Sequence, residues 1–184
     1  PHPPVWIAAI SAEESFLYAA KNGFNLMIVP YAGKPGLLQE YVRLYRKVWA
    51  ESGHQPGAEQ VQVAQFCYVA EESAQAKKGF ERICRRYLET FADACTAWQG
   101  KSSDQYPGYD KMVASIMATT PEKIVAQGGA FVGTPDEVAA QVQRCIDAFG
   151  RIEPSMQINF GGSTDQDAFR TLELFAAEVM PRFN

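Results

Sequence analysis

Short apolar runs alternate with longer stretches of helical periodicity along this chain of 184 residues. Continuous apolar runs near residues 5–10 and 25–30 are typical of strands that are buried on both faces of a parallel sheet. A third run, residues 61–69, is rich in β-branched and aromatic residues, and a fourth lies at 156–160. Because helical sequence follows each run, the pattern predicts consecutive parallel βα units.

Signals for helix boundaries support these units. Ser11 and Glu14 have the spacing of a capping box at the start of the first helix, and Gly23 is suited to end it. Thr134 and Glu137 have the same spacing. Further helices are predicted at residues 37–52, 71–98, 109–118 and 121–127, from Thr134 to about Gly150, and after the fourth strand as far as Pro181.

Residues 71–130 are too long to be a simple connection between the third and fourth strands, so they predict a helical insertion. A (β/α)8 barrel needs about 250 residues, and the four predicted units are half of one. We therefore predict an α/β fold of parallel βα units, with residues 1–184 as a single domain. The chain begins Pro-His-Pro-Pro, without Met and just before a strand, which suggests a piece of a longer protein.

Composition narrows the class of protein. The net charge is −4 without a Lys/Arg cluster, which argues against nucleic acid as a partner. No apolar run approaches the roughly 20 residues of a membrane-spanning helix. Neither histidine lies near a cysteine pair, so no zinc site is expected, and reduced thiols in a cytoplasmic protein are the default. The cysteines are scattered at Cys67, Cys84, Cys95 and Cys145.

The turn from Ser11 to Ser15 is the strongest candidate for a binding site. It follows the first strand and opens a helix, so free backbone N–H groups, the helix dipole and two hydroxyls could bind a phosphate. The acidic Glu13 and Glu14 would oppose an anion unless they point outward. The alternative is that Ser11 only caps the helix.

A second candidate for phosphate binding is the turn Gly161–Thr164, which follows the last strand. The favoured interpretation there is a cap of the last helix by Ser163 or Thr164. Asp165 and Asp167 suit the helix dipole and argue against an anion at this turn.

Other chemistry is sparse. Phe66 and Tyr68, near the end of the third strand, could face a ligand ring, but core packing is the more common role and they stay unassigned. We find no Ser/His/Asp or Cys/His constellation, a pattern that suits a protein whose cofactor supplies the reactivity.

Taken together, the order and spacing of the motifs resemble the C-terminal half of the bacterial luciferase-like, flavin-dependent monooxygenases. The family has an apolar strand, a Ser-rich turn and Ala-Ala-x-x-Gly, then a Gly-Thr/Ser-Pro-Glu-Glu helix start, a short strand and a Leu-Phe-x-x-Glu/Asp-Val-Met/Leu-Pro helix. The matching segments here are 7–15, 19–23, 133–137, 157–160 and 174–181.

The resemblance implies strands five to eight of a TIM (β/α)8 barrel. It also implies reduced FMN from a separate flavin reductase, O2 as co-substrate and oxygenation of a small organic molecule through a flavin C4a-hydroperoxide. The family's phosphate-binding turn corresponds to Ser11, Ala12, Glu14 and Ser15. Its mobile lid corresponds to the insertion, with Lys101–Gln105 and Pro107–Gly108 as the mobile stretch. Its catalytic residues lie largely in strands one to four, so none is assigned.

Three alternatives stay open at this stage. The first is a deazaflavin-dependent oxidoreductase of the same fold, and the second is a non-catalytic flavin-binding half-barrel. The third is an unrelated open parallel α/β domain. A half-barrel exposes two sheet edges, so we expect self-association or pairing with an N-terminal half-barrel.

Overall fold

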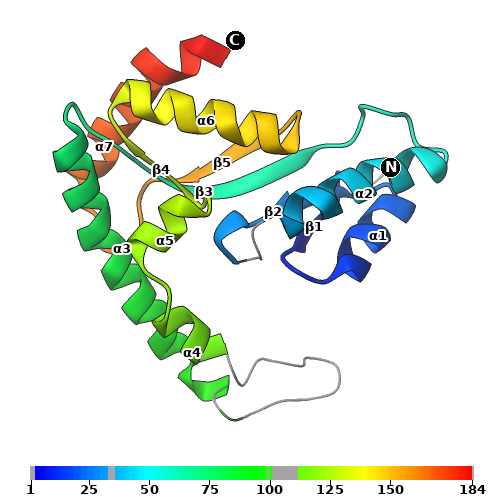
Figure 1. Ribbon diagram of the computed structural model, residues 1–184, viewed down its shortest axis with the longest axis horizontal. Coiled ribbons are helices and arrows are strands. Elements are labelled where there is room, and N and C mark those ends of the chain that lie inside the picture. Colours follow the sequence, from blue (N-terminus) through cyan, green and yellow to red (C-terminus); the bar gives the residue numbers. More distant parts are fainter. Residues whose placement is uncertain (1–2, 33–35, 99, 101–111, 184) are drawn as a thin grey trace. The chain divides into compact units, whose positions relative to one another are not determined.

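The computed structural model describes residues 3–32, 36–98, 100 and 112–183 (Figure 1). These residues group into two compact units, which are described separately below. The first unit comprises Pro1–Cys67, Gln127–Phe131 and Ala139–Gln157. The second comprises Tyr68–Ala126, Val132–Val138 and Ile158–Asn184.

The strands of the first unit form the predicted parallel sheet. Trp6 of β1 (Trp6–Ala9) pairs with Asn25 of β2 (Asn25–Ile28), and Leu26 pairs with Val61 of β3 (Val61–Val69). On the other edge of β3, Gln62 pairs with Glu153 of β5 (Glu153–Gln157). These pairings are all parallel, and β3 lies between β2 and β5.

An additional short strand that the sequence pattern did not predict, β4 (Ala130–Gly133), also pairs with β3. The amide of Phe66 donates to the carbonyl of Gly129, and the amide of Ala70 donates to that of Gly133. All four residues of β4 are buried. A run of four residues that leads directly into a capped helix carries too short a pattern to be distinguished from a connection.

Two amphipathic helices, α1 (Glu13–Lys21) and α2 (Leu37–Glu51), pack against each other in the first unit. The buried stripe of α2 has the helical spacing that the sequence indicated: Leu38, Val42, Tyr45 and Trp49. As predicted, Gly23 follows α1 in the left-handed conformation, at φ 68°. Helix α6 (Pro135–Phe149) contributes the buried Val142 and Cys145 to this unit.

The second unit is built around α3 (Ser73–Cys95), which packs against α4 (Met112–Met117) and α5 (Pro121–Ala126). Its core face carries Ala76, Phe80, Ile83 and Cys84. The last α-helix, α7 (Asp165–Leu174), continues as a π-helical turn and then as a 3-10 turn, Met180–Phe183, that contains Pro181. The predicted insertion between the third and fourth strands is thus helical.

Two predictions, one of a boundary and one of burial, need correction. The fourth predicted strand, β5, begins at Glu153, three residues earlier than the pattern suggested. Strand β1 is not buried on both faces of the sheet. Ala8 is exposed in this strand, and Ile10 just after it is 45% exposed.

Within the described part of the chain, none of the helices has the length and apolar character needed to cross a membrane.

Candidate functional site

The predicted phosphate-binding turn lies where the sequence analysis placed it, directly after β1 and at the start of α1. Ser11, Ala12 and Glu14 are exposed, and Ser15 is half-buried. The amide of Ser15 donates to the carbonyl of Ala12 at 3.1 Å, so this amide is already used within the turn. In a parallel sheet this is the end of the strand at which barrels carry their active sites.

The prediction that Ser11 caps this helix is wrong. The N-cap residue is Ala12, with φ −91° and ψ 113°, and no side chain accepts a hydrogen bond there. The helix begins at Glu13, so the Ser11 hydroxyl precedes the N-cap position from which it would reach the first-turn amides. The first-turn N–H groups of α1 therefore have no capping side chain, and Glu13 and Glu14 are exposed beside them.

The rival turn, Gly161–Thr164, is a helix cap, as the favoured interpretation predicted. The Thr164 hydroxyl accepts from the amide of Asp167 at 3.1 Å, and the carboxylate of Asp167 accepts from the amide of Thr164 at 3.0 Å. This is a complete capping box at the start of α7. Ser163 instead donates to the side chain of Asn159 at 2.8 Å.

The glycine of this turn also has a structural partner. Gly161 has a φ of 57°, and a Cβ at this position would overlap the carbonyl oxygen of Ile83 in α3. The space beside Gly161 is therefore filled by the backbone of α3. Gly161 therefore allows this loop to pack closely against α3.

A polar cluster that the sequence analysis did not identify lies in the second unit and is centred on Asp167. The Tyr68 hydroxyl donates to Oδ1 of Asp167 at 2.7 Å, and Nη2 of Arg82 lies 2.8 Å from Oδ2. The Thr164 hydroxyl donates to the same Oδ2 at 2.8 Å. Tyr68 is at the end of β3, Arg82 is on α3 and Asp167 is in the first turn of α7, so the cluster joins three elements.

The electrostatics of this cluster follow from its hydrogen bonds. Burial acts to raise the pKa of Asp167, but the bonds from Tyr68, Thr164 and Arg82 outweigh it and hold the pKa well below its usual range. Burial, followed by the hydrogen bond to Asp167, raises the pKa of Tyr68 to about 12. Asp167 is therefore an anion and Tyr68 a neutral donor at neutral pH.

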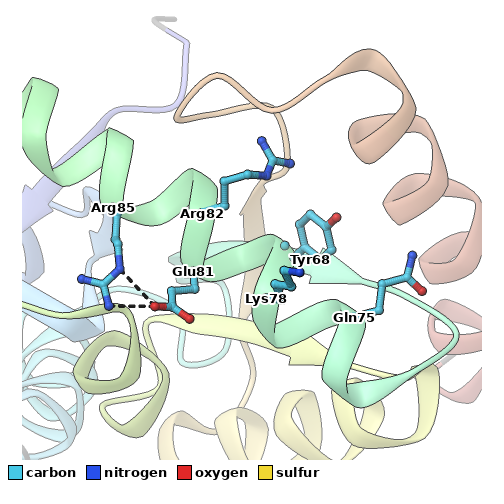
Figure 2. A pocket seen from close by; sticks show the side chains of 7 residues that line it. Tyr68, Gln75, Lys78, Glu81, Arg82 and Arg85 are labelled. Atoms are coloured by element: carbon cyan, nitrogen blue, oxygen red, sulfur yellow. Dashed lines mark hydrogen bonds and ion pairs between the residues drawn. The ribbon is translucent and has the colours of Figure 1, made fainter.

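Two pockets adjoin this cluster and share the side chains of Tyr68 and Gln75. One, of about 530 Å³, runs along α3 and is shown in Figure 2. The other, of about 370 Å³, is bounded by the residues after β3 and by Gln166, Asp167 and Arg170 of α7. The first is lined by Tyr68, Gln75, Lys78, Gly79, Glu81, Arg82 and Arg85.

The sequence contained a signal for the first pocket that the apolar pattern masked. Gln75, Lys78, Arg82 and Arg85 recur at intervals of three and four residues, so they lie along one face of a helix. The buried stripe on the opposite side of the pattern, which includes Phe80 and Ile83, is the stronger signal in this helix. Asp167 was identified as an acid that suits the helix dipole, but its long-range partners are visible only in the tertiary structure.

The other predicted functional residues are Phe66, Tyr68 and those of the lid. Phe66 is 1% exposed and its ring stacks on that of Tyr31 at 5.3 Å, whereas Tyr68 is 7% exposed and hydrogen-bonded as above. The predicted lid residues Lys101–Gln105 and Pro107–Gly108 lie outside the described residues. In the part of the chain that the structure describes, no group of three or more His, Cys, Asp or Glu side chains could hold a metal ion.

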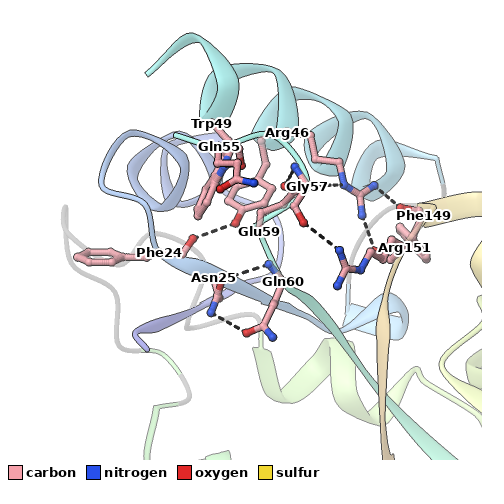
Figure 3. Close-up of polar contacts among 11 residues, drawn as sticks. Phe24, Asn25, Arg46, Trp49, Gln55, Gly57, Glu59, Gln60, Phe149 and Arg151 are labelled. Atoms are coloured by element: carbon pink, nitrogen blue, oxygen red, sulfur yellow. Dashed lines mark hydrogen bonds and ion pairs between the residues drawn. The ribbon is translucent and has the colours of Figure 1, made fainter. Parts of the chain in front are cut away.

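The opposite, N-terminal ends of the strands in the first unit carry a polar network of a different kind (Figure 3). Arg46 of α2 pairs with Glu59 at 3.3 Å and donates to the backbone carbonyls of Phe149 and Arg151. Asn25 and Gln60 exchange two hydrogen bonds of 3.1 Å. These groups bond to one another or to backbone, which indicates a stabilising role at this end of the sheet.

Comparison with known proteins identifies the family. A sequence model described as luciferase-like monooxygenase matches residues 1–151, which is most of the chain. The chain belongs to the luciferase-like monooxygenase family. The resemblance inferred from the motif order is thereby confirmed. A search of curated protein sequences found no match.

Solved structures support the same fold. A monooxygenase from Streptomyces bottropensis is 27% identical, with a TM-score of 0.80 over 100% of this chain and 49% of its own. The FMN complex of the oxygenating constituent of 3,6-diketocamphane monooxygenase from Pseudomonas putida is 18% identical. Its TM-score is 0.69, and the match covers 99% of this chain and 49% of that structure's chain. The coenzyme F420-dependent tetrahydromethanopterin reductase from Methanopyrus kandleri is 13% identical. Its TM-score is 0.63, and the match covers 98% of this chain and 51% of that structure's chain.

The fraction of each solved structure that the match covers bears on the architecture of this chain. This luciferase-like chain spans about half the length of the solved structures that it resembles. Its parallel βα units are consistent with half of a barrel, as the count of predicted strands suggested. The third alternative, an unrelated open α/β domain, is therefore excluded.

Proposed function

We propose that the protein to which this chain contributes is a monooxygenase that uses reduced FMN and O2 to oxygenate a small organic substrate. The observation that carries the proposal is the family match over residues 1–151. The similar oxygenating constituent from Pseudomonas putida, whose structure contains FMN, adds support. A separate flavin reductase would supply the reduced cofactor, and an N-terminal half-barrel would complete the site.

Within this chain, the turn with Ser11, Ala12, Glu14 and Ser15 would hold the phosphate of FMN. The first-turn amides of α1 have no capping side chain, so an anion can accept their hydrogen bonds and benefit from the helix dipole. The hydroxyls of Ser11 and Ser15 are candidate further donors, and the exposed Glu14 is free to turn towards solvent. These donors fit a phosphate group, while the bound flavin would supply the redox chemistry.

A matched pair of ligands tests the phosphate assignment. The purified chain is titrated with FMN and with riboflavin, which lacks the phosphate, and binding is followed by quenching of flavin fluorescence. We expect FMN to bind at least about tenfold more tightly, because a hydrogen bond to a charged group contributes about 1.5–3 kcal/mol. Equal affinities, or no binding at high micromolar FMN, would contradict a sufficient phosphate site in this chain.

Variants locate the site within the chain. We expect Ser15→Ala to weaken FMN binding by about tenfold and to leave riboflavin binding unchanged. Ser163→Ala in the turn before α7 is the control, since Ser163 already donates to Asn159, and it should bind FMN like the parent. If Ser15→Ala had no effect while Ser163→Ala weakened FMN binding, the rival turn would be the site.

A deazaflavin-dependent oxidoreductase is a second candidate, because F420-dependent enzymes are among the similar structures, with TM-scores of 0.63 and 0.62. Parallel titrations with F420 and FMN distinguish the two: tighter binding of F420 would favour hydride transfer over oxygenation. Tight FMN binding without O2-dependent turnover in the protein with both halves would favour a non-catalytic flavin-binding protein.

A further inference from the structure

The pocket along α3 has the size of a small-molecule site and shares no residue with the turn before α1. Its volume of about 530 Å³ falls within the range of roughly 300–1,000 Å³ that is usual for ligand pockets. All of its lining residues belong to the second unit, and all but Tyr68 come from α3. In Figure 2, Gln75, Lys78 and Arg82 lie along the helix beside Tyr68.

The apolar part of the pocket is an aromatic ring lying against a glycine. A Cβ at residue 79 would overlap the ring and hydroxyl of Tyr68, so Gly79 is what allows the ring to lie close to α3. The hydrogen bond to Asp167 fixes the hydroxyl end of this ring. Around it, the aliphatic parts of Lys78 and Arg82 add further apolar surface. Tyr68 is 7% exposed, so the pocket offers a ligand the edge of a fixed aromatic ring together with these aliphatic parts.

The charges around this ring are not balanced within the protein. Arg85 pairs with Glu81 at 2.7 Å, and Arg82 pairs with Asp167 at 2.8 Å, so these two cations are neutralised. Lys78 has no hydrogen bond or ion pair with any described residue, and the side chain of Gln75 likewise makes none. One ammonium group with its donors, and one amide, thus remain available to a ligand.

We propose that this pocket binds a small aromatic monocarboxylate, whose ring lies against the accessible edge of Tyr68 and the aliphatic parts of Lys78 and Arg82, and whose carboxylate pairs with Lys78. One unpaired cation matches one negative charge, which favours a carboxylate over a phosphate dianion. The Gln75 amide donates to the second carboxylate oxygen. The pocket uses none of the residues proposed for FMN, so this inference stands or falls independently of the flavin.

The test uses 2-naphthoate as the probe and the neutral 2-naphthylmethanol as its matched control, by isothermal titration of the purified chain without flavin. We expect the carboxylate to bind at least tenfold more tightly than the alcohol. Equal binding of the two, or no detectable binding of 2-naphthoate at millimolar concentration, would overturn the proposal. Competition by inorganic phosphate as effective as 2-naphthoate itself would also overturn it.

Neighbouring lysines supply the matched variants. Lys78 lines the pocket, whereas the adjacent Lys77 does not. Lys78→Gln should abolish the preference for the carboxylate, Lys78→Arg should retain it, and Lys77→Gln should bind like the parent. Circular dichroism checks that all three variants fold. A Lys77→Gln variant that loses as much affinity as Lys78→Gln would show a general charge effect and would refute a specific pocket.

Discussion

Asp167 shows how one residue can serve a helix and a tertiary contact at the same time. It completes the capping box with Thr164, so its backbone and one carboxylate oxygen satisfy the start of α7. The other oxygen accepts from Tyr68, and Arg82 of α3 pairs with the carboxylate. Its low pKa therefore reports interactions that exist only in the folded state.

We predict that Asp167→Asn lowers the free energy of unfolding at pH 7 by about 1–2 kcal/mol, because charge-assisted bonds are replaced by neutral ones. A folded-state pKa well below the unfolded value of about 3.9 means that the stabilisation is complete above that unfolded pKa, declines below it, and is lost only as the pH falls through the folded-state pKa. Urea unfolding should therefore show a difference between the parent and the variant that is full at pH 7 and smaller at pH 3.

Asp165→Asn is the control for this prediction. Asp165 lies in the same first turn but is exposed and outside the hydrogen-bonded cluster, so its replacement should change stability by less than about 0.5 kcal/mol. A difference between the parent and Asp167→Asn that stays constant from pH 7 to pH 3 would contradict the assigned protonation.

At the scale of elements, the second unit depends on the close approach of the turn before α7 to α3. Gly161 lies against the backbone of Ile83. The ring of Phe160 packs against those of Phe80 and Tyr87 on α3, with ring centroids 6.2 and 6.0 Å apart. The buried hydroxyl of Thr171 accepts from the amide of Val69, which ties α7 to the end of β3. The glycine turn therefore positions two helices.

Two adjacent glycines give a sharp test of this close approach. Gly161→Ala should lower the free energy of unfolding by about 3 kcal/mol, because the methyl group meets backbone atoms that cannot move independently. Gly162 has a φ of 71°, but a Cβ there would meet only the flexible side chain of Arg86, so Gly162→Ala should cost about 1 kcal/mol. Equal losses in urea unfolding would show that backbone conformation alone matters.

At the scale of the whole molecule, the parallel sheet leaves strand edges open among the described residues. The edge of β1 away from β2 and the edge of β5 away from β3 have no strand partner there. Open edges present unpaired N–H and C=O groups to other chains. The half-length match to barrel structures gives these edges a ready explanation, since a closed barrel would pair both.

We predict that the isolated chain self-associates through these edges at micromolar concentrations, as measured by sedimentation velocity over a dilution series. Ala8→Lys, on the exposed face of β1, should weaken the association, because lysine at an edge strand disfavours strand pairing. Met117→Lys on α4 is the control, since Met117 is 68% exposed but lies outside the sheet. A chain that is monomeric at all concentrations would refute the prediction.

The fold was largely predictable because its signals are local. The buried stripe of α2, the left-handed Gly23 and the capping signals at Thr134 and Thr164 each depend on residues within a few positions of one another. Their order along the chain then sufficed to identify the family. The cap at Ser11 was predicted one residue too early, and β4 was not predicted at all. Both errors have a related reason, because a shift of one residue in a helix start, or a strand of only four residues, changes the local sequence pattern very little.

The tertiary structure alone decided the features that join distant segments. The Tyr68–Asp167 hydrogen bond spans 99 positions, and no periodicity in the sequence predicts such a pair. The same holds for Gly161 against Ile83, and for the pairings that leave Lys78 as the unpaired cation of its pocket. Propensity and pattern act over a few residues, whereas charge pairing and close packing depend on which surfaces the folded chain brings together.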